Sequence, residues 1–154
     1  MYAWVLDPWA RVLLLDVGGG RMNLPGGTPE PFDADWRATL RREVLEEADV
    51  TVRDVVWLGF QEVCSDGEPP YAQIRVAARL DRWWPSSPDP DNGRVYARRW
   101  VPLGEAAPML GWGGPGRAQE AAVARVARDI YGMVVAAGIA QGASAASAVV
   151  MQVV

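Results

Sequence analysis

The chain contains no histidine and a single cysteine, Cys64. Without an imidazole group, serine–histidine triads, histidine-ligated zinc sites and phosphohistidine intermediates are all excluded. One cysteine cannot form an internal disulfide, and this agrees with a reducing cytoplasm. Any catalysis must therefore depend on carboxylates, arginines or a bound metal ion.

Lysine is also absent, so all fifteen basic residues are arginines, and the formal net charge is -4. A pI near 4.8 argues against broad nucleic-acid binding, which normally needs a basic face. The length of 154 residues suits one domain with a sizeable core. Residues 1–8 lack a positive segment and a long apolar run, so we expect no secretory signal and a cytoplasmic protein.

Residues 130–154 carry no charge, and this length could cross a bilayer. However, Gly, Ala, Ser and Gln fill much of the segment, and neither an aromatic belt nor a basic cluster flanks it. We therefore expect no membrane span. Residues 132–154 are predicted to form a helix packed on the core or a partly disordered tail that pairs with a second subunit. We therefore expect a homodimer.

The hydrophobic pattern predicts a mixed sheet with helices on two faces, an α/β fold. Strands are expected near 4–6, 11–15, 52–63, 72–80 and 94–101, and helices near 35–48, 102–105 and 116–131. In strand 72–80, Gln73, Arg75 and Arg79 fall on the polar face. In helix 116–131, Ala121, Val123, Val126 and Ile130 fall near the apolar face.

Three carboxylates occupy five positions of the expected first helix. Glu43, Glu46 and Glu47 stand at i, i+3 and i+4, so their side chains leave one face of the helix. Neighbouring like charges destabilise a helix, and a bound cation would offset this cost. Mg²⁺ and Mn²⁺ prefer oxygen ligands and commonly bridge carboxylates to substrate phosphates. A solvated acidic face is the alternative interpretation.

A turn at Leu24-Pro25-Gly26-Gly27 precedes this helix. Glycine exposes backbone groups with no side chain in the way, so a carbonyl of Gly26 or Gly27 could join the metal ligands. Arg42 lies four residues before Glu46, where an ion pair would orient that carboxylate.

Gly27-Thr28-Pro29-Glu30-Pro31-Phe32-Asp33 and Arg42-Glu43-Val44-Leu45-Glu46-Glu47-Ala48-Asp49-Val50 together resemble the Nudix box, Gly-x5-Glu-x7-Arg-Glu-U-x-Glu-Glu-x-Gly-U, where U is apolar. This resemblance implies an α/β/α sandwich over residues 1–131 that uses Mg²⁺ or Mn²⁺ to hydrolyse the pyrophosphate bond of a nucleoside diphosphate linked to another moiety. It also implies metal ligands and catalytic residues within the box. The metal ligands would be Gly27, Glu43, Glu46 and Glu47, with Glu46, Glu47 and Arg42 as catalytic residues.

The chain departs from the box at three places. Asp33 stands at the position of the first glutamate, and the spacer from it to Arg42 is one residue too long. Phe32 and Asp49 stand where the box commonly has glycine. We place the extra residue in the loop before the helix, where added length costs little, and expect Asp49 to end the helix in a left-handed conformation. The contribution of Asp33 stays open.

Several residues outside the box are candidates for substrate binding. Arg21, Arg75 and Arg98 could each bind a phosphate, because a guanidinium grips phosphate in bidentate fashion, or could be solvated surface arginines. Trp83, Trp84 or Trp112 could rim a pocket and stack on a base. Asp89 and Asp91 could supply a general base, although turn formation is the simpler interpretation.

Two alternatives to a nucleotide pyrophosphohydrolase follow from the same resemblance. The departures from the box allow a catalytically silent Nudix-like protein that binds or senses a nucleotide. An isopentenyl-diphosphate isomerase type of relative is weakened, because the histidine and cysteine that such chemistry uses are not evident. The identity of the substrate does not follow from the sequence.

Overall fold

The computed structural model describes residues 1–64, 67 and 69–136. Its elements in chain order are β1 (Tyr2–Leu6), β2 (Arg11–Gly18), β3 (Arg21–Asn23), α1 (Trp36–Ala48), β4 (Val50–Val63), β5 (Tyr71–Trp83), β6 (Ala97–Pro102), α2 (Leu103–Leu110) and α3 (Gly113–Asp129). This confirms the predicted order of strands, helix, strands and helices, and α/β is the fold class.

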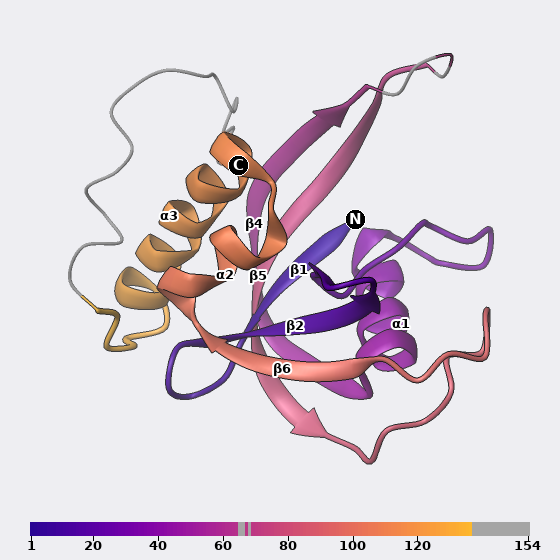
Figure 1. Cartoon of the computed structure of the whole chain (residues 1–154), viewed down its shortest axis with the longest axis horizontal. Helices are drawn as coiled ribbons and strands as arrows, with labels where there is room; N and C mark the ends of the chain where they lie inside the picture. The colour runs from indigo at the N-terminus through magenta and orange to yellow at the C-terminus, as the bar shows by residue number, and fades with distance from the viewer. Residues whose placement is uncertain (65–66, 68, 137–154) are drawn as a thin grey trace.

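The strands form one mixed sheet in the order β3-β2-β1-β5-β4, and β6 pairs with β2. The pairing of β1 with β5 is parallel, whereas the other pairs are antiparallel. The first helix lies on one side of the sheet and the last two lie on the other (Figure 1). The parallel pair places β1 in the middle of the sheet, between β2 and β5.

Both faces of β1 and β2 are buried. Trp4, Leu6, Val12 and Leu14 belong to the core formed with α2 and α3, while Val5 and its neighbours on the opposite face belong to the core formed with α1. Because alternate residues of a strand point to opposite faces, burial on both sides requires an almost continuous apolar sequence. Residues 3–6 and 12–15 supply such sequences.

Helix α1 begins and ends close to the predicted residues. The Asp35 carboxylate accepts hydrogen bonds from the backbone N–H groups of Arg37 (2.8 Å) and Ala38 (2.9 Å), which makes Asp35 the N-cap. Asp49 ends the helix with φ 47° and ψ 44°. This left-handed conformation is the one expected from the sequence.

Several expected boundaries and the expected position of one residue differ in the structure. Strand β6 begins at Ala97 instead of residue 94, and the short helix expected near 102–105 continues to Leu110 despite Pro108. The sequence pattern predicts Ile130 on the apolar face of the last helix, but this residue follows α3 and is 60 % exposed. Ile130 lies one helical turn after Val126, but α3 ends at Asp129 and Ile130 is its C-cap.

The expectation for the C-terminal tail falls mainly on residues 137–154, which lie outside the described residues. Within the described part, Met133 and Val135 contact the core formed with α2 and α3. No helix among the described residues is long and apolar enough to cross a membrane. The homodimer stays a prediction.

Candidate active site

Helix α1 presents its acidic residues to the Gly26-Gly27 turn because its apolar side is anchored in the core. Leu40 and Val44 are fully buried against β1 and β2. On the same helix, Glu43 is only 7 % exposed, whereas Glu46 and Glu47 are partly buried. We call Glu43, Glu46 and Glu47 the acidic cluster.

The glycine turn lies directly against this cluster. The backbone N–H of Gly26 donates a hydrogen bond to Glu47 Oε2 at 2.7 Å. A Cβ atom at Gly27 would overlap the carboxylate of Glu43, and one at Gly26 (φ 149°) would overlap the backbone of Met1. Gly26 therefore permits a close approach to the Met1 backbone that no other residue could make, whereas a side chain at Gly27 would have to displace the Glu43 carboxylate.

Arg42 connects the loop before α1 to the acidic cluster. Its guanidinium nitrogens lie 2.9 Å from Asp33, 3.1 Å from Glu43 and 2.9 Å from Glu46, and one also donates to the carbonyl of Thr28 at 3.0 Å. The hydrogen bond from Arg42 lowers the pKa of Asp33 to about 2, with help from the N–H of Glu30. The structure thus gives Asp33 a role in fixing Arg42, despite the longer spacer.

Burial disfavours the charged form of two members of the acidic cluster. It raises the pKa of Glu47 to about 7, against the opposing effect of the Gly26 hydrogen bond, while the charges of Glu43 and Asp89 raise it further. Burial is also the main cause that raises the pKa of Glu43, against the opposing influence of Arg42, and Glu46 and Asp91 add to the rise. Two buried carboxylates side by side form a site where a cation would be strongly favoured.

The loop between β5 and β6 brings Asp89 and Asp91 within electrostatic range of this cluster. Asp89 is 4 % exposed and accepts hydrogen bonds from the N–H of Asp91 (2.8 Å) and from Asn92 Nδ2 (2.9 Å). These bonds agree with the simpler interpretation of Asp89 as a turn-forming residue.

Two kinds of metal site can be compared: one in which the protein supplies all the ligands, and one in which a substrate supplies some of them. The acidic cluster fits the second kind better. Among the described residues, no group of three or more His, Cys, Asp or Glu side chains is close enough to hold a metal. Glu46 is engaged by Arg42, and the Gly27 carbonyl accepts a hydrogen bond from the amino group of Met1. Arg42 also lies 3.1 Å from Glu43, so Glu47 is the member of the cluster that forms no ion pair with Arg42. Mg²⁺ commonly takes one or two carboxylates and fills its other positions with water and phosphate oxygens.

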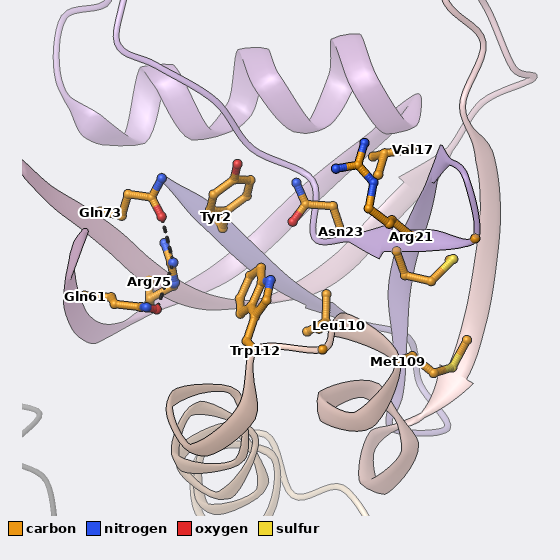
Figure 2. Close-up of a pocket in the computed structure, with 13 residues that line it drawn as sticks. Tyr2, Val17, Arg21, Asn23, Gln61, Gln73, Arg75, Met109, Leu110 and Trp112 are labelled. Atoms are coloured by element: carbon orange, nitrogen blue, oxygen red, sulfur yellow. Dashed lines mark hydrogen bonds between the residues drawn. The ribbon is translucent and has the colours of Figure 1, made fainter. Parts of the chain in front are cut away.

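The structure also contains a pocket of about 610 Å³, and none of its lining residues belongs to the acidic cluster. Its lining comes from β1 to β5, from the end of α2 and from Gly111 and Trp112 after it, and the rings of Tyr2 and Trp112 lie 5.9 Å apart there (Figure 2). Burial is the largest cause that lowers the pKa of the Met1 amino group, and the charge of Arg75 lowers it further, whereas the charges of Glu43 and Glu47 raise it.

Comparison with known families gives one decisive match. The model of the NUDIX domain matches residues 2–120, which is most of the chain. The chain belongs to the Nudix family. It is therefore a hydrolase that acts on phosphorus-containing anhydrides.

Solved structures agree with the Nudix fold. The MutT mutator protein of Bacillus halodurans is 20 % identical with a TM-score of 0.60, over 77 % of this chain and 77 % of that one. The C. elegans Ap4A hydrolase is 18 % identical with a TM-score of 0.54, over 80 % of this chain and 92 % of that one. A Nudix hydrolase from Nitrosomonas europaea is 20 % identical with a TM-score of 0.54, over 71 % and 75 %. A search of curated proteins found no match.

The pocket of this Nudix domain contains some of the arginines and tryptophans singled out in the sequence. Arg21, Arg75 and Trp112 line it. Arg98 is not among its lining residues, because it donates hydrogen bonds to the carbonyls of Ala48 and Trp84, each at 3.0 Å, and to Ser86 Oγ at 2.8 Å. Arg98 therefore fastens the loop after β5 to the end of the Nudix helix, and its role as a phosphate ligand stays a prediction. Trp83 and Trp84 are exposed but lie outside the lining.

Arg75 differs from its expected place on a solvated strand face, because it is only 4 % exposed. Its guanidinium donates to the side-chain oxygens of Gln73 (2.8 Å), Gln61 (3.1 Å) and Gln119 (3.2 Å). It also lies 5.0 Å from the ring of Tyr2 and 5.1 Å from the ring of Trp112. Burial lowers the pKa of Arg75 to about 10, so it stays charged at neutral pH.

Sequence reasoning missed four polar residues of this pocket region: Tyr2, Asn23, Gln61 and Gln119. They come from β1, β3, β4 and α3, and only the fold brings them together. Alternation along β5 did place Gln73 and Arg75 on one face, but it gave no sign that α3 covers that face.

Proposed function

We propose that this Nudix domain hydrolyses the pyrophosphate bond of a nucleoside diphosphate linked to another moiety, and that it needs Mg²⁺ or Mn²⁺. The main support is the packing of Glu43 and Glu47 against the Gly26-Gly27 backbone, and the same domain holds a pocket large enough for a nucleoside. Two buried carboxylates are costly without a cation, and a substrate diphosphate would bring further negative charge to the same place.

The proposed ligands of the ion are Glu43, Glu47 and the Gly27 carbonyl, with help from Glu46. When bound, the divalent ion would neutralise charge on the diphosphate and make an attacking water more acidic. The hydrogen bonds of Arg42 hold the Glu46 carboxylate in one orientation and keep the loop from Thr28 to Asp33 next to α1. The amino group of Met1 would have to yield the Gly27 carbonyl to the ion.

Glu47 is the better placed of the two proposed proton acceptors. Its Oε2 is used by Gly26, which leaves Oε1 for a proton, whereas Glu46 is held by Arg42. Without metal, burial raises the pKa of Glu47 to about 7, and the proposed ion would favour the charged form that can accept a proton. Glu46 remains the second candidate for this role.

The pocket provides the proposed substrate contacts. Arg21 and Arg75 line it, so a negatively charged or oxygen-rich part of the substrate would meet positive charge there. The names of two similar structures, a MutT protein and an Ap4A hydrolase, are consistent with a nucleotide substrate. A panel of nucleoside triphosphates, ADP-ribose, sugar nucleotides, dinucleoside polyphosphates and capped RNA, assayed with Mg²⁺, would identify the preferred compound.

The substitution Glu47→Gln tests the catalytic assignment. The oxygen of the introduced amide can still accept the Gly26 hydrogen bond, so the fold should persist, but the charge and the proton acceptor are lost. We expect metal-dependent turnover to fall by at least about 100-fold, the low end for loss of general acid–base catalysis. Phosphate release with and without Mg²⁺ or Mn²⁺ measures this effect.

Glu62→Gln is the matched control, because Glu62 is an exposed residue of β4 outside the acidic cluster. It should leave turnover unchanged. A Glu47→Gln protein as active as the parent would contradict the assignment. Nucleotide binding without turnover by the parent, with every compound and metal tried, would instead favour the silent binding protein.

A further inference from the structure

Phe32 is a large apolar side chain on the loop before α1, and it is 74 % exposed. It stands where the Nudix box commonly has glycine, and among the described residues it belongs to neither hydrophobic core. Pro29 and Pro31 beside it are also exposed, so this part of the loop presents an apolar surface to solvent. Single exposed apolar residues are common on protein surfaces, so only the position of Phe32 can give it significance.

The backbone that carries Phe32 is held in one conformation. The N–H of Asp33 donates to the carbonyl of Glu30 at 2.9 Å, and the N–H of Glu30 donates to Asp33 Oδ2 at 2.9 Å. Pro31 restricts the backbone between these two residues. Arg42 joins the turn to α1 through its hydrogen bond to Asp33 at 2.9 Å. Because the turn is already ordered, a ligand that contacts Phe32 would pay little entropy for ordering it.

This turn lies next to the acidic cluster. The guanidinium carbon of Arg42 lies 5.6 Å from the centre of the Phe32 ring. Nitrogens of the same guanidinium lie 3.1 Å from Glu43 and 2.9 Å from Glu46. One side chain thus separates the Phe32 ring from carboxylates that are proposed to help hold the ion. A group attached to a diphosphate at that ion would come within reach of the ring.

Phe32 lies apart from the pocket of Figure 2. The described residues that line this pocket include none from the loop before α1 and none from α1 itself. Two of the lining residues, Met109 and Leu110, belong to α2, which covers the face of the sheet opposite to α1 (Figure 1). A substrate with a group at each end of its diphosphate would therefore find two separate contacts, one in the pocket and one at Phe32.

The groups around Phe32 favour a flat ring over a sugar. The Asp33 carboxylate and the Thr28 carbonyl already accept hydrogen bonds from Arg42, so they offer little to the hydroxyl groups of a sugar. An aromatic ring offers a face on which any base can stack. The nearby charge of Arg42 disfavours a cationic ring. The group that fits Phe32 is an uncharged planar ring.

We propose that Phe32 stacks on the second moiety of the substrate, and that this Nudix domain therefore prefers diphosphates that carry a nucleoside at both ends over sugar nucleotides. This proposal rests on the proposed function, because it names the substrate class of the same site. The pocket receives one nucleoside, and Phe32 receives the planar ring of the other. ADP-ribose has the same diphosphate and both riboses but leaves Phe32 without a stacking partner.

Matched substrates test this preference. Diadenosine diphosphate and NADH differ from ADP-ribose in carrying a planar ring at the anomeric carbon of the terminal ribose in place of a hydroxyl group. With Mg²⁺, we expect kcat/KM to be at least about fivefold higher for both than for ADP-ribose, because of the added stacking. Equal values, a preference for ADP-ribose, or hydrolysis of nucleoside triphosphates alone would overturn the proposal.

Substitutions show whether Phe32 causes the preference. Phe32→Ala should lower the ratio of kcat/KM for diadenosine diphosphate over ADP-ribose at least about fivefold, and Phe32→Tyr, which keeps the ring, should maintain it. Because Phe32 is exposed, both variants should keep the melting temperature of the parent. An unaltered ratio in Phe32→Ala, whether or not the rates themselves fall, would leave Phe32 only the role of covering Arg42 and would contradict the proposal.

Trp9→Ala is the matched control. Trp9 is 73 % exposed in the turn between β1 and β2, and the guanidinium carbon of Arg11 lies 5.1 Å from the centre of its ring. It is thus an exposed aromatic residue beside an arginine, as Phe32 is, but it is not among the described residues that line the pocket. The substrate ratio should stay unchanged in this variant, and a fall equal to that of Phe32→Ala would contradict a specific role of Phe32.

Binding measurements separate failure of this proposal from failure of the proposed function. Calorimetric titration of the full chain uses methylene-bridged, non-hydrolysable analogues of diadenosine diphosphate and ADP-ribose with Mg²⁺. The first should bind at least about fivefold more tightly, and Phe32→Ala should remove the difference. That result in a protein that hydrolyses no nucleotide would support the stacking and contradict the hydrolytic function. Hydrolysis with equal binding would do the reverse, and equal binding without hydrolysis would contradict both.

Discussion

Single residues of the acidic cluster are constrained by backbone groups as much as by each other. Glu47 is held by the Gly26 N–H, and Glu43 fills the space that a side chain at Gly27 would need. This close packing explains why glycine is favoured at Gly26 and Gly27, where a Cβ atom would overlap the Met1 backbone or the Glu43 carboxylate. At Gly27 the cause is space alone, because its φ is not positive.

Gly27→Ala should therefore destabilise the protein. The added methyl group must displace the Glu43 carboxylate or the turn, and such overpacking typically costs about 1 to 3 kcal/mol. Gly114→Ala is the control, since nothing lies within 4 Å of a Cβ there and Gly114 is in a helix. It should be neutral or stabilise by up to about 1 kcal/mol. Urea unfolding of both variants measures the difference, and equal stabilities would refute the packing argument.

At the scale of elements, the C-terminal end of α1 organises the loop that follows β5. The Asp49 carboxylate accepts hydrogen bonds from the N–H (3.1 Å) and the hydroxyl of Ser87, and its carbonyl accepts from Trp84 at 2.9 Å. Asp49 thus replaces the glycine of the Nudix box with a residue that both ends the helix and anchors the loop carrying Asp89. The sequence predicted the left-handed conformation, but not the contact with Ser87.

Substitutions of Asp49 can separate these two roles. Asp49→Gly keeps the left-handed conformation without strain but loses the anchor, so we expect a loss of about 1 kcal/mol from the missing hydrogen bonds. Asp49→Ala should cost about 1 kcal/mol more, because Ala is strained in that conformation. Thermal and urea unfolding measure both, and Ser87→Ala isolates the hydroxyl contact. Equal losses for Gly and Ala would argue against the strain contribution.

At the scale of the whole molecule, the burial of Glu47 makes stability depend on pH. Its pKa in the folded protein, about 7, lies above the value of an exposed glutamate, so the folded state holds this proton more tightly than the unfolded chain. Stability is therefore lost as the pH rises from about 4.5 through 7, on the order of 3 kcal/mol from this group. A divalent ion competes with the proton and should restore stability at high pH.

Thermal unfolding with Mg²⁺ or Mn²⁺ tests this linkage. The rise in Tm on adding metal should be larger at pH 8 than at pH 5.5, with NaCl of equal ionic strength as the control for screening. Glu47→Gln should be more stable than the parent at pH 8 without metal, and it should lose most of the metal-induced rise. The same pH profile and metal response in both proteins would contradict the placement of the ion at Glu47.

The local features of this protein were determined by its sequence alone. The turn at Gly26-Gly27, the register of Glu43, Glu46 and Glu47 on α1, and the pairing of Arg42 with Glu46 all depend on residues close together in the chain. Helical and strand periods are local properties, so the sequence predicted these elements to within a few residues. It also predicted the Nudix family from the spacing of the box.

Only the tertiary structure decided the character of the substrate pocket. The pattern of β5 shows which residues share a face with Arg75, but burial of that face depends on α3 and Gln119, 44 residues away along the chain. The same reason applies to Arg98, whose hydrogen bonds to Ala48, Trp84 and Ser86 reach other elements, and to Ile130, which the helical period placed near the apolar face but which follows the end of α3. A periodic pattern assigns a side chain to a face, whereas the packing of distant elements decides what covers that face and which hydrogen bonds remain free for a ligand.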